Sequence, residues 1–434
     1  MGDVLKAPRG TADVLPPQTS KWVYVEDSMR RFASRFGYEE IRTPIFENSE
    51  LFLRSIGEAT DIVTKEMYTF TDKGGRSNTL RPEMTASVIR AYLEHQLTAQ
   101  SLVKWFYIGP GFRYERPQSG RFRQFHQLGV EAIGSENPAL DAEIILLALE
   151  LFSALGLKNL EVRVNSIGCR ECRPSYREKL RGYFKDHLQE LCEDCRTHRF
   201  EKNPLRILDC KVETCRTLVS KSPVSIDHLC APCEEHFRKL KHWLDKLGFH
   251  YTLDPFLVRG LEYYTRTVFE IISKELGAQN TLCGGGRYDN LVELLGGPPK
   301  PAVGFAAGIE RIILVMENLQ VSFPEHKVDL YVAVLGERAE DHLLPVMMGL
   351  RRCGLHVRGD YNRRTLGAQL KEADRFGARW SLLIGENELS KNMAVLRNMQ
   401  TREQVEIPLD HLEQEVIAKI LSGHRDPVSV KESV

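Results

Sequence analysis

The sequence predicts a multidomain protein of mixed structure, in which an α+β part is followed by an α/β part. Three features support this prediction: a β-hairpin pattern at residues 104–131, a cysteine-rich segment at 169–235, and alternating strand and helix patterns at 327–425. A chain of 434 residues suggests two to four domains, and its 42% hydrophobic and 27% charged residues are typical of a soluble globular protein.

The N-terminal part begins with a helix pattern and a strand pattern. Residues 19–36 carry apolar side chains at helical spacing, and Thr19 or Ser20 is suited to cap the first turn. Residues 37–47, GYEEIRTPIFE, alternate as in a strand. Pro44 lacks a backbone N–H, so this strand is expected to bend or to lie at the edge of a sheet.

Residues 104–131 give the clearest strand signal. Along KWFYIGPGFRYE and RFRQFHQLGVE, large apolar residues share one parity, whereas the opposite parity carries Arg113, Glu115, Arg121, Arg123, Gln127 and Glu131. Because side chains alternate between the two faces of a strand, the hairpin is predicted to have one apolar face and one charged face. Exposure to solvent explains poorly why arginines gather around the turn RPQSG.

The remaining elements alternate on both sides of the cysteine-rich segment. Helices are predicted at 140–155 and 234–248, and strands at LEVRVNSIG and RTVFEII. The apolar second half of PAVGFAAGIERIILVMEN is a further helix pattern. The predicted parts are 1–168 and 236–322 as two halves of one domain, 169–235 as an insertion, 327–425 as an α/β domain and 426–434 as a polar tail.

Charge and targeting signals narrow the classes of function. Lys and Arg total 59, as do Asp and Glu, so any binding of nucleic acid must come from local basic patches and not from net charge. The sequence has no run of eighteen apolar residues, and its first residues lack the apolar run of a signal peptide. We therefore expect a cytoplasmic protein that makes no contact with a membrane.

Eight of the ten cysteines fall between residues 169 and 233, at spacings typical of metal sites. A reducing cytosol disfavours disulfides, and paired CxxC spacings are typical of tetrahedral zinc-thiolate sites. The candidate ligands, which would fill two such sites with a pairing that the sequence leaves open, are Cys169, Cys172, Cys192, Cys195, Cys210, Cys215, Cys230 and Cys233. The alternative is a set of reduced cysteines packed as small apolar groups.

The stretch LVRGLEYYTRTVFE at 257–270 places two arginines and two tyrosines between core-like segments. A guanidinium buried without a partner is very costly, so this stretch is expected to face an anion. Further arginines, carboxylates, tyrosines and glycines occur in the hairpin, in CGGGRYD and in GFAAGIERI. Arginine forks match phosphate oxygens, while carboxylates with tyrosine hydroxyls suit an amine, which together predict a nucleotide and a small zwitterion side by side. The chain has no GxxxxGK[ST] motif, which argues against the P-loop mode of ATP binding.

These motifs resemble those of class II aminoacyl-tRNA synthetases, and within them those of bacterial-type histidyl-tRNA synthetases. The first helix with GYEEIRTPIFE resembles motif 1, FRYERPQSGRFRQFHQLGVE resembles motif 2 and GFAAGIERI resembles motif 3, while LVRGLEYYTRTVFE and CGGGRYD are similar to the two histidine motifs. The resemblance covers nearly the whole chain. It implies an antiparallel sheet flanked by helices, the cysteine-rich helical insertion and a C-terminal α/β anticodon-binding domain.

The resemblance also implies an activity and its site. Members of this family activate L-histidine with ATP, accompanied by Mg²⁺, and transfer the histidine to the 3′ end of tRNA(His), as homodimers formed through motif 1. The residues implied for histidine are Glu83, Met84, Thr85, Gln127, Glu131, Arg259, Tyr263, Tyr264 and Tyr288. The residues implied for ATP are Arg113, Glu115, Arg121, Arg123, Gly308 and Arg311.

Arg259 and Arg113 are the catalytic residues that the resemblance implies. Both would contact the α-phosphate of ATP, where negative charge builds as the substrate carboxylate attacks, and Arg259 would do part of the work that a metal ion does in related enzymes. We expect no general base, since a carboxylate is already a nucleophile. Any zinc would be structural, because the implied mechanism does not use it.

Transfer RNA is expected to contact two places. Arg116 and Gln118, in the motif 2 loop, are candidates for contact with its acceptor end. In the C-terminal domain, the arginines that could contact RNA phosphates, or could equally belong to a solvated face, are Arg351, Arg352, Arg358, Arg363 and Arg364.

Three other functions are compatible with parts of the sequence. A synthetase-like regulatory subunit of histidine biosynthesis does not charge tRNA, but such subunits generally lack the C-terminal domain and have eroded motifs, whereas this chain keeps Arg113, Arg259 and Arg311. An RNA-binding or sensing module of synthetase origin would not need a complete set of ATP and histidine residues. A zinc-ribbon nucleic-acid binder would explain only residues 169–233.

Overall fold

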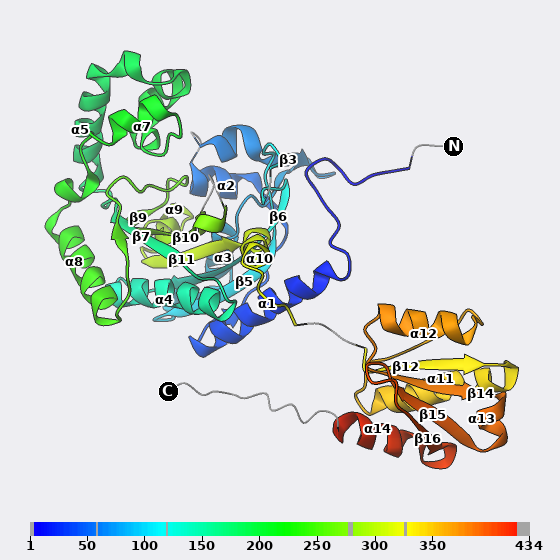
Figure 1. The fold of residues 1–434 in the computed structure, drawn as a ribbon. Helices are drawn as coiled ribbons and strands as arrows, with labels where there is room; N and C mark the ends of the chain where they lie inside the picture. The colour runs from blue at the N-terminus through cyan, green and yellow to red at the C-terminus, as the bar shows by residue number, and fades with distance from the viewer. Residues whose placement is uncertain (1–3, 58–59, 119, 277–280, 325–327, 423–434) are drawn as a thin grey trace. The chain divides into compact units, whose positions relative to one another are not determined.

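The computed structural model describes residues 4–57, 60–118, 120–276, 281–324 and 328–422, and the chain divides after Pro324 into two compact units. The predicted tail at 426–434 lies outside the described residues. In Figure 1 the first unit runs from blue to yellow and the second from yellow to red. No helix of the described residues is long and apolar enough to cross a membrane.

The first unit is built on an eight-stranded sheet. From edge to edge its strands are β1 (Glu39–Glu40), β5 (Val103–Phe112), β6 (Gln124–Ile133), β11 (Ala302–Gly308), β10 (Thr281–Arg287), β9 (Thr265–Ser273), β7 (Leu160–Ser166) and β8 (Thr252–Leu253). Every pairing from β5 across to β7 is antiparallel, whereas the two edge pairings, β1–β5 and β7–β8, are parallel. The expected antiparallel sheet is therefore confirmed, with parallel additions at both edges.

Helices cover both faces of this sheet. One face packs on α1 (Gln18–Arg35), α4 (Pro138–Ala154), α8 (Ala231–Lys246) and α10 (Ile309–Asn318). The other face is covered by α3 (Thr85–Glu94) and α9 (Leu291–Leu294), with α2 (Ser49–Ile56) packed on α3. In Figure 1 α1 and α4 lie below the strands and α2 lies above them.

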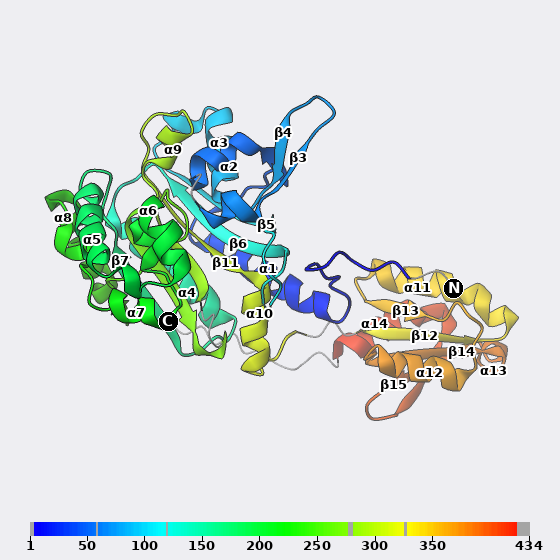
Figure 2. The same cartoon turned by 90° about the horizontal axis from the view of Figure 1, so that it is seen from above.

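Residues 37–47 were predicted to form one strand, but they contribute to two. It supplies β1 to the large sheet, and then β2 (Phe46–Asn48) to a separate three-stranded sheet with β4 (Ser77–Leu80) and β3 (Tyr68–Thr71). Figure 2 shows β3 and β4 projecting as a hairpin from the first unit. The helix before this stretch was expected to be capped by Thr19 or Ser20. It instead begins at Gln18 after Pro17, without a side-chain cap.

The charged face of the predicted hairpin is buried at Glu131 and becomes more exposed toward the turn, where Arg121 is exposed. On β5 and β6, Phe106 and Val130 point into the core with α1 and α4, as their parity predicts. On the opposite face Tyr107 and Glu131 are also buried, because α3 covers that face. Tyr107 and Glu131 therefore line an interior site.

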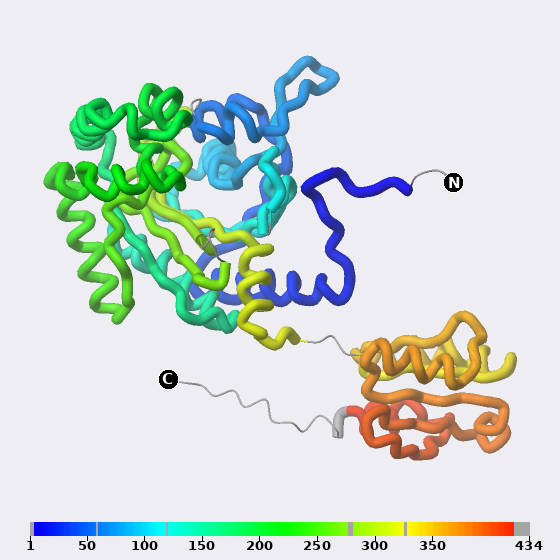
Figure 3. Tube along the Cα trace, turned by 45° about the horizontal axis from the view of Figure 1, so that its top comes forward, coloured from blue at the N-terminus to red at the C-terminus, as the bar shows by residue number. Residues whose placement is uncertain are grey.

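The cysteine-rich insertion forms a helical lobe that is green in Figure 3. Its helices are α5 (Arg173–Asp186), α6 (Phe200–Lys202) and α7 (Glu213–Val219), and they enclose a small core of their own that includes Leu180 and Phe184. The second unit is a five-stranded sheet in the order β13 (Val357–Gly359), β12 (Leu330–Leu335), β14 (Trp380–Gly385), β15 (Met393–Asn398) and β16 (Gln404–Pro408). Its helices are α11 (Glu337–Arg352), α12 (Leu366–Arg375), α13 (Glu386–Ser390) and α14 (Leu412–Ser422).

A buried ion pair joins α4 to the large sheet. Arg287, at the end of β10, and Asp141, on α4, are both fully buried, and Nη2 of the arginine lies 2.8 Å from Oδ1 of the aspartate. Thr267 on β9 donates a second hydrogen bond of 2.6 Å to the same carboxylate. This pair fixes the helix against the strands that carry the predicted histidine motifs.

Removing the carboxylate should destabilise the first unit strongly. In Asp141→Ala the guanidinium of Arg287 stays buried without its main counter-charge, so the free energy of unfolding is expected to fall by about 3–5 kcal/mol. Urea unfolding followed by circular dichroism measures this change. Glu150→Ala, an exposed position on the same helix, is the matched control and should change stability by less than about 0.5 kcal/mol. A loss below about 1 kcal/mol in Asp141→Ala would contradict a structural role for the pair.

Candidate active site

The interior site is built around Glu131, which lies on β6 at the centre of the large sheet. Its Oε1 accepts a hydrogen bond of 2.6 Å from the Thr85 hydroxyl and one of 3.3 Å from the Tyr107 hydroxyl, and its Oε2 accepts one from the Tyr288 hydroxyl. A Cβ on Gly304, on neighbouring β11, would lie 1.9 Å from Oε2, so the absence of a side chain there leaves room for the carboxylate. Side chains from α3, from β5 and from the residue after β10 thus hold one acidic group in a fixed orientation.

Burial changes the ionisation of this carboxylate. Loss of hydration raises the pKa of Glu131 to about 8, although the hydrogen bonds from Thr85 and Tyr288 act in the opposite direction. A carboxyl group with this pKa can be neutral or charged near neutral pH, as suits a group that exchanges a proton or hydrogen bond with a titratable ligand.

A second carboxylate, Glu83, lies two residues before α3 begins at Thr85. Its two oxygens accept backbone hydrogen bonds from Thr85, at 2.6 Å, and from Ala86, at 2.9 Å. Burial raises the pKa of Glu83, while these two bonds lower it. Met84, the N-cap of the helix, is fully buried beside this carboxylate.

Three tyrosines form one wall of the site. The rings of Tyr263 and Tyr264 lie 4.8 Å apart, those of Tyr263 and Tyr288 lie 5.6 Å apart, and all three side chains are buried. The guanidinium of Arg259 lies 5.9 Å from the centre of the Tyr264 ring. Arg259 is therefore connected to Glu131 by a chain of contacts. The chain runs through the rings of Tyr264, Tyr263 and Tyr288 and ends in the hydrogen bond from the Tyr288 hydroxyl to Glu131.

Arg259 pairs with a carboxylate that the sequence analysis did not single out. Its Nη1 donates to Oε1 of Glu270 on β9, and Oε2 of Glu270 accepts a hydrogen bond of 3.1 Å from Thr281. The backbone carbonyl of Thr281 accepts a bond of 2.6 Å from Nη1 of Arg311. A Cβ on Gly284 would lie 2.2 Å from Arg259 Nη2, which explains a glycine at that place. Within VFEII, Glu270 is a charged residue between apolar neighbours. This contrast is the signal by which the sequence could have revealed it as a candidate partner of a buried cation.

The remaining predicted ATP residues surround the end of the β5–β6 hairpin. Arg113 donates a hydrogen bond of 2.9 Å to the carbonyl of Pro82, directly before Glu83. Glu115 accepts from Arg121 at 2.9 Å, and its backbone carbonyl accepts from Arg123 at 3.3 Å. Arg123 also stacks over Tyr114, 3.7 Å from the ring centre.

The arginines produce a positive local field. Burial, and next the charge of Arg121, lower the pKa of the Arg311 guanidinium, with Arg113 acting in the same direction. Arg311 lies in the first turn of α10, directly after β11 ends at Gly308. Cations held close together against their mutual repulsion are typical of a site for a multiply charged anion.

Two buried polar atoms in this region lack hydrogen-bond partners among the described residues. They are Oε1 of Gln127, on β6, and Nε of Arg259. Buried polar atoms are normally paired, so a ligand with a donor and an acceptor group would satisfy both. The structure brings Met84, Tyr263, Tyr264 and Tyr288 into one cluster on the α3 side of the large sheet, and Glu131 and Arg259 contact this cluster at Tyr288 and Tyr264.

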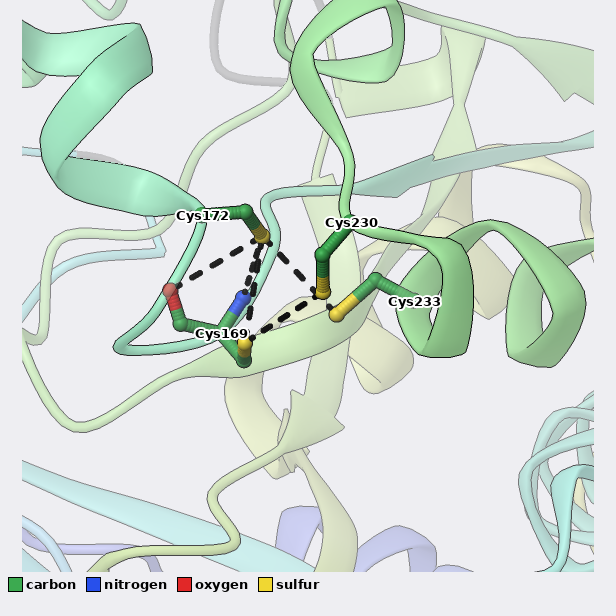
Figure 4. Close-up of side chains that lie close together, drawn as sticks. All are labelled: Cys169, Cys172, Cys230 and Cys233. Atoms are coloured by element: carbon green, nitrogen blue, oxygen red, sulfur yellow. Dashed lines mark hydrogen bonds between the residues drawn. The ribbon is translucent and has the colours of Figure 1, made fainter.

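The structure also gives the pairing of the cysteines. Cys169 and Cys172 meet Cys230 and Cys233, and Figure 4 shows the four sulfur atoms turned toward one another. Within this first cluster the Sγ atom of Cys169 lies 3.8 Å from the Sγ atom of Cys172 and 3.8 Å from that of Cys230. The second cluster contains Cys192, Cys195, Cys210 and Cys215, and in each cluster the sulfur atoms all lie within 4.8 Å of one another.

Both clusters could bind a metal ion. Four thiolates placed at about 2.3 Å from one Zn²⁺ in a tetrahedron would have sulfur–sulfur separations of about 3.8 Å, which match the observed distances. Backbone N–H groups point at the sulfur atoms, from Cys169 to Cys172 at 3.2 Å and from Cys192 to Cys215 at 3.2 Å. Burial opposes ionisation of Cys169, but backbone hydrogen bonds lower the pKa of its thiol to about 7.

The residues predicted to contact tRNA lie on the surface. Arg116 and Gln118 are exposed near the turn of the β5–β6 hairpin. In the second unit Arg351, Arg352, Arg358 and Arg363 are exposed and Arg364 is half-buried. Arg363 pairs with Glu340 at 2.9 Å, and Arg364 pairs with Asp360 at 2.6 Å, so the charges of these two are already balanced by neighbouring carboxylates.

Comparison with known proteins identifies the family. The family described as "Histidyl-tRNA synthetase" matches residues 10–312, and the one described as "Anticodon binding domain" matches residues 329–419. The chain belongs to the histidyl-tRNA synthetase family. A curated relative from Halothermothrix orenii, named "Histidine--tRNA ligase", is 53% identical over 95% of this chain and 99% of its own length. Another of the same name, from Pelotomaculum thermopropionicum, is 50% identical over 95% of this chain and 97% of its own length.

Solved structures of histidyl-tRNA synthetases share the fold. The apo enzyme from S. aureus is 39% identical, with a TM-score of 0.81 over 95% of this chain and 100% of that one. A protein from Bacillus halodurans C, described as an ATP phosphoribosyltransferase regulatory subunit/histidyl-tRNA synthetase, is 21% identical, with a TM-score of 0.60 over 88% of this chain and 98% of that one. At 21% identity, the similarity to the Bacillus halodurans protein concerns the fold alone. The high identity to curated histidine–tRNA ligases favours tRNA charging over a role as a regulatory subunit of histidine biosynthesis.

Proposed function

We propose that this chain is a histidine–tRNA ligase that works in two steps. First the carboxylate of L-histidine attacks the α-phosphorus of ATP, the bond to the bridging oxygen breaks, and pyrophosphate leaves. Then a hydroxyl of the 3′-terminal ribose of tRNA(His) attacks the carbonyl carbon of the adenylate, and AMP leaves. The observation that carries this proposal is the continuous contact from the Glu131 pocket, through Tyr264, to the arginines around Arg259.

Histidine is assigned to the end of the site around Glu131. Glu131 and Tyr264 pair with the imidazole nitrogens, while Glu83, Thr85 and Gln127 receive the α-amino group. The unpartnered oxygen of Gln127 supports this assignment, because it needs a donor. Met84, Tyr263 and Tyr288 close the pocket around the ring.

ATP is assigned to the arginine-rich end of the site. Arg113 and Arg259 contact the α-phosphate and stabilise the charge that develops there. Glu115 lies on the adenine side, Arg121 and Arg123 reach the outer phosphates, and Arg311 with Gly308 holds the γ-phosphate end. Mg²⁺ bound together with ATP would supply positive charge that offsets the charge of the outer phosphates.

We further assign the partners outside this site. The second unit binds the tRNA anticodon region, with Arg351, Arg352, Arg358, Arg363 and Arg364 as candidate phosphate contacts, and Arg116 with Gln118 meets the acceptor end. Exposed Ile45 and Phe46 support a homodimer formed through the segment that follows β1. Zn²⁺ is assigned to the two cysteine clusters in a structural role, and the enzyme is assigned to the cytoplasm.

The charging of tRNA(His) with labelled histidine tests this proposal. The purified protein with ATP and Mg²⁺ should transfer histidine to tRNA(His), and should transfer it much more slowly to a control tRNA of another specificity. Activation of histidine without transfer to tRNA would favour a regulatory or sensing protein over a ligase.

A further inference from the structure

The first cysteine cluster closes the base of the insertion. Cys169 follows β7 by three residues and Cys172 precedes α5, so this pair lies where the chain leaves the large sheet. Cys230 and Cys233 lie at the start of α8, where the chain returns to the catalytic unit. Gly168 has a left-handed backbone, with φ of +70°, and a Cβ there would lie 2.6 Å from the sulfur of Cys172. The backbone is therefore shaped to bring both CxxC segments together.

The same base holds the segment directly before β9, which carries Tyr263 and Tyr264. Arg173, the residue after Cys172, donates to the backbone carbonyl of Tyr264 and, at 3.2 Å, to that of Gly168. The backbone N–H of Arg266 donates to Gly168 O at 2.8 Å, and Ile167 N–H donates to Arg266 O at 2.8 Å. Displacement of the first cluster would therefore be transmitted to Tyr264 through hydrogen bonds.

The charge beside the first cluster is consistent with a bound metal. Within the described part of the chain, every hydrogen bond of the Arg173 side chain goes to an uncharged carbonyl. Arg266, in contrast, already has two carboxylates as counter-charge, at 3.7 Å in Glu136 and at 3.8 Å in Asp289. Four neutral thiols would give Arg173 no counter-charge, whereas one Zn²⁺ with four thiolates carries a net charge of −2.

The second cluster has different neighbours. Its cysteines belong to the core of the insertion, together with Phe184 and Leu218. The residues of the catalytic segment that pack on this core are Phe256 and Val258, and not the tyrosines. The two clusters can therefore be distinguished by their effect on the histidine pocket.

We propose that the first cluster, Cys169, Cys172, Cys230 and Cys233, is a zinc tetrathiolate site that positions Tyr264 for the binding of histidine. This assignment rests on the proposed function for its readout, but the presence of zinc can be measured independently of activity. Arg173 is a positioning residue, because it links the metal site to the Tyr264 carbonyl and does not reach the substrate itself.

Three variants of the full-length protein test the assignment. Zinc is measured by mass spectrometry, and histidine-dependent ATP–pyrophosphate exchange gives kcat and KM. The wild type should hold about two zinc ions per chain, and the pair Cys169→Ser with Cys230→Ser should hold about one while the KM for histidine rises about tenfold or more. Arg173→Ala should keep both ions and show the same rise in KM. This variant tests the positioning role even if the cysteine variant fails to fold. The pair Cys192→Ser with Cys210→Ser should also lose one ion, with a change in histidine KM below about threefold.

The outcomes separate this inference from the proposed function. Wild-type protein without zinc would overturn the metal site whatever its activity. An unchanged KM for histidine in Arg173→Ala, or in the Cys169 and Cys230 variant after loss of one ion, would overturn the positioning role. If the wild type held two zinc ions but exchanged no pyrophosphate with histidine, the proposed function would fail while the metal assignment stood.

Discussion

Replacing Arg259 by alanine is expected to lower kcat for histidine-dependent pyrophosphate exchange by about a thousandfold. The guanidinium is held in place before the substrates bind. It donates a hydrogen bond to Glu270 and lies against Gly284, where a side chain would occupy its position. A fixed cation stabilises charge that develops at the α-phosphate more than it stabilises the bound substrates, so the main loss should be in kcat and not in KM for ATP. Steady-state exchange at varied ATP and histidine measures both constants.

An arginine of similar size outside the site is the control for this prediction. Arg238, on α8, is exposed and pairs with Glu235 at 2.7 Å, so Arg238→Ala should leave exchange within about twofold of the wild type. Residual activity of Arg259→Ala above about a tenth of the wild type would mean that another group neutralises the α-phosphate, and the assignment of this arginine would be wrong.

The replacement of Glu131 by glutamine should give the second-largest effect, a fall of at least about a hundredfold in kcat/KM for histidine. Glutamine keeps the size of the side chain but cannot carry the charge that accepts an imidazole N–H, and its amide N–H₂ would meet the hydroxyls of Thr85 and Tyr288 as a donor. A site whose buried polar groups are matched to one substrate loses most of its preference when one of them changes.

The pH dependence of histidine binding provides an independent check on Glu131. The raised pKa of about 8 means that the group is protonated in the free enzyme below that pH, so the carboxylate fraction grows about tenfold per pH unit up to about 8. The KM for histidine should therefore fall as pH rises from about 6.5 to about 8 and then level off. Glu131→Gln should show no such fall, whereas Glu136→Gln, an exposed control, should keep it. A pH-independent KM in the wild type would contradict the requirement for the carboxylate.

The sequence indicated candidate site residues but did not reveal their surroundings. Arginines, glycines and paired tyrosines in rare local patterns predicted an anion and a zwitterion, and the family resemblance gave each residue a proposed role. Parity placed Gln127 and Glu131 on one face of a strand, but it did not reveal that α3 buries this face. The helix comes from a distant part of the chain, and periodicity within a strand carries no information about what packs on it.

Contacts between distant residues were the main features that the sequence could not give. Glu270 stands eleven residues from Arg259, and Asp141 stands 146 residues from Arg287, and neither pairing has a local signature. The spacing of the cysteines predicted metal ligands, but eight cysteines allow many pairings. Only the return of the chain at α8 shows that Cys169 and Cys172 meet Cys230 and Cys233.

The most direct test of the central claim is ATP–pyrophosphate exchange by the purified protein with each standard amino acid in turn. We expect exchange with histidine, and rates at least about a thousandfold lower with every other amino acid, because the polar groups of Glu131 and the tyrosines stay unpaired when another side chain enters. Exchange with a different amino acid, or with none, would contradict the assignment of this site to the activation of histidine.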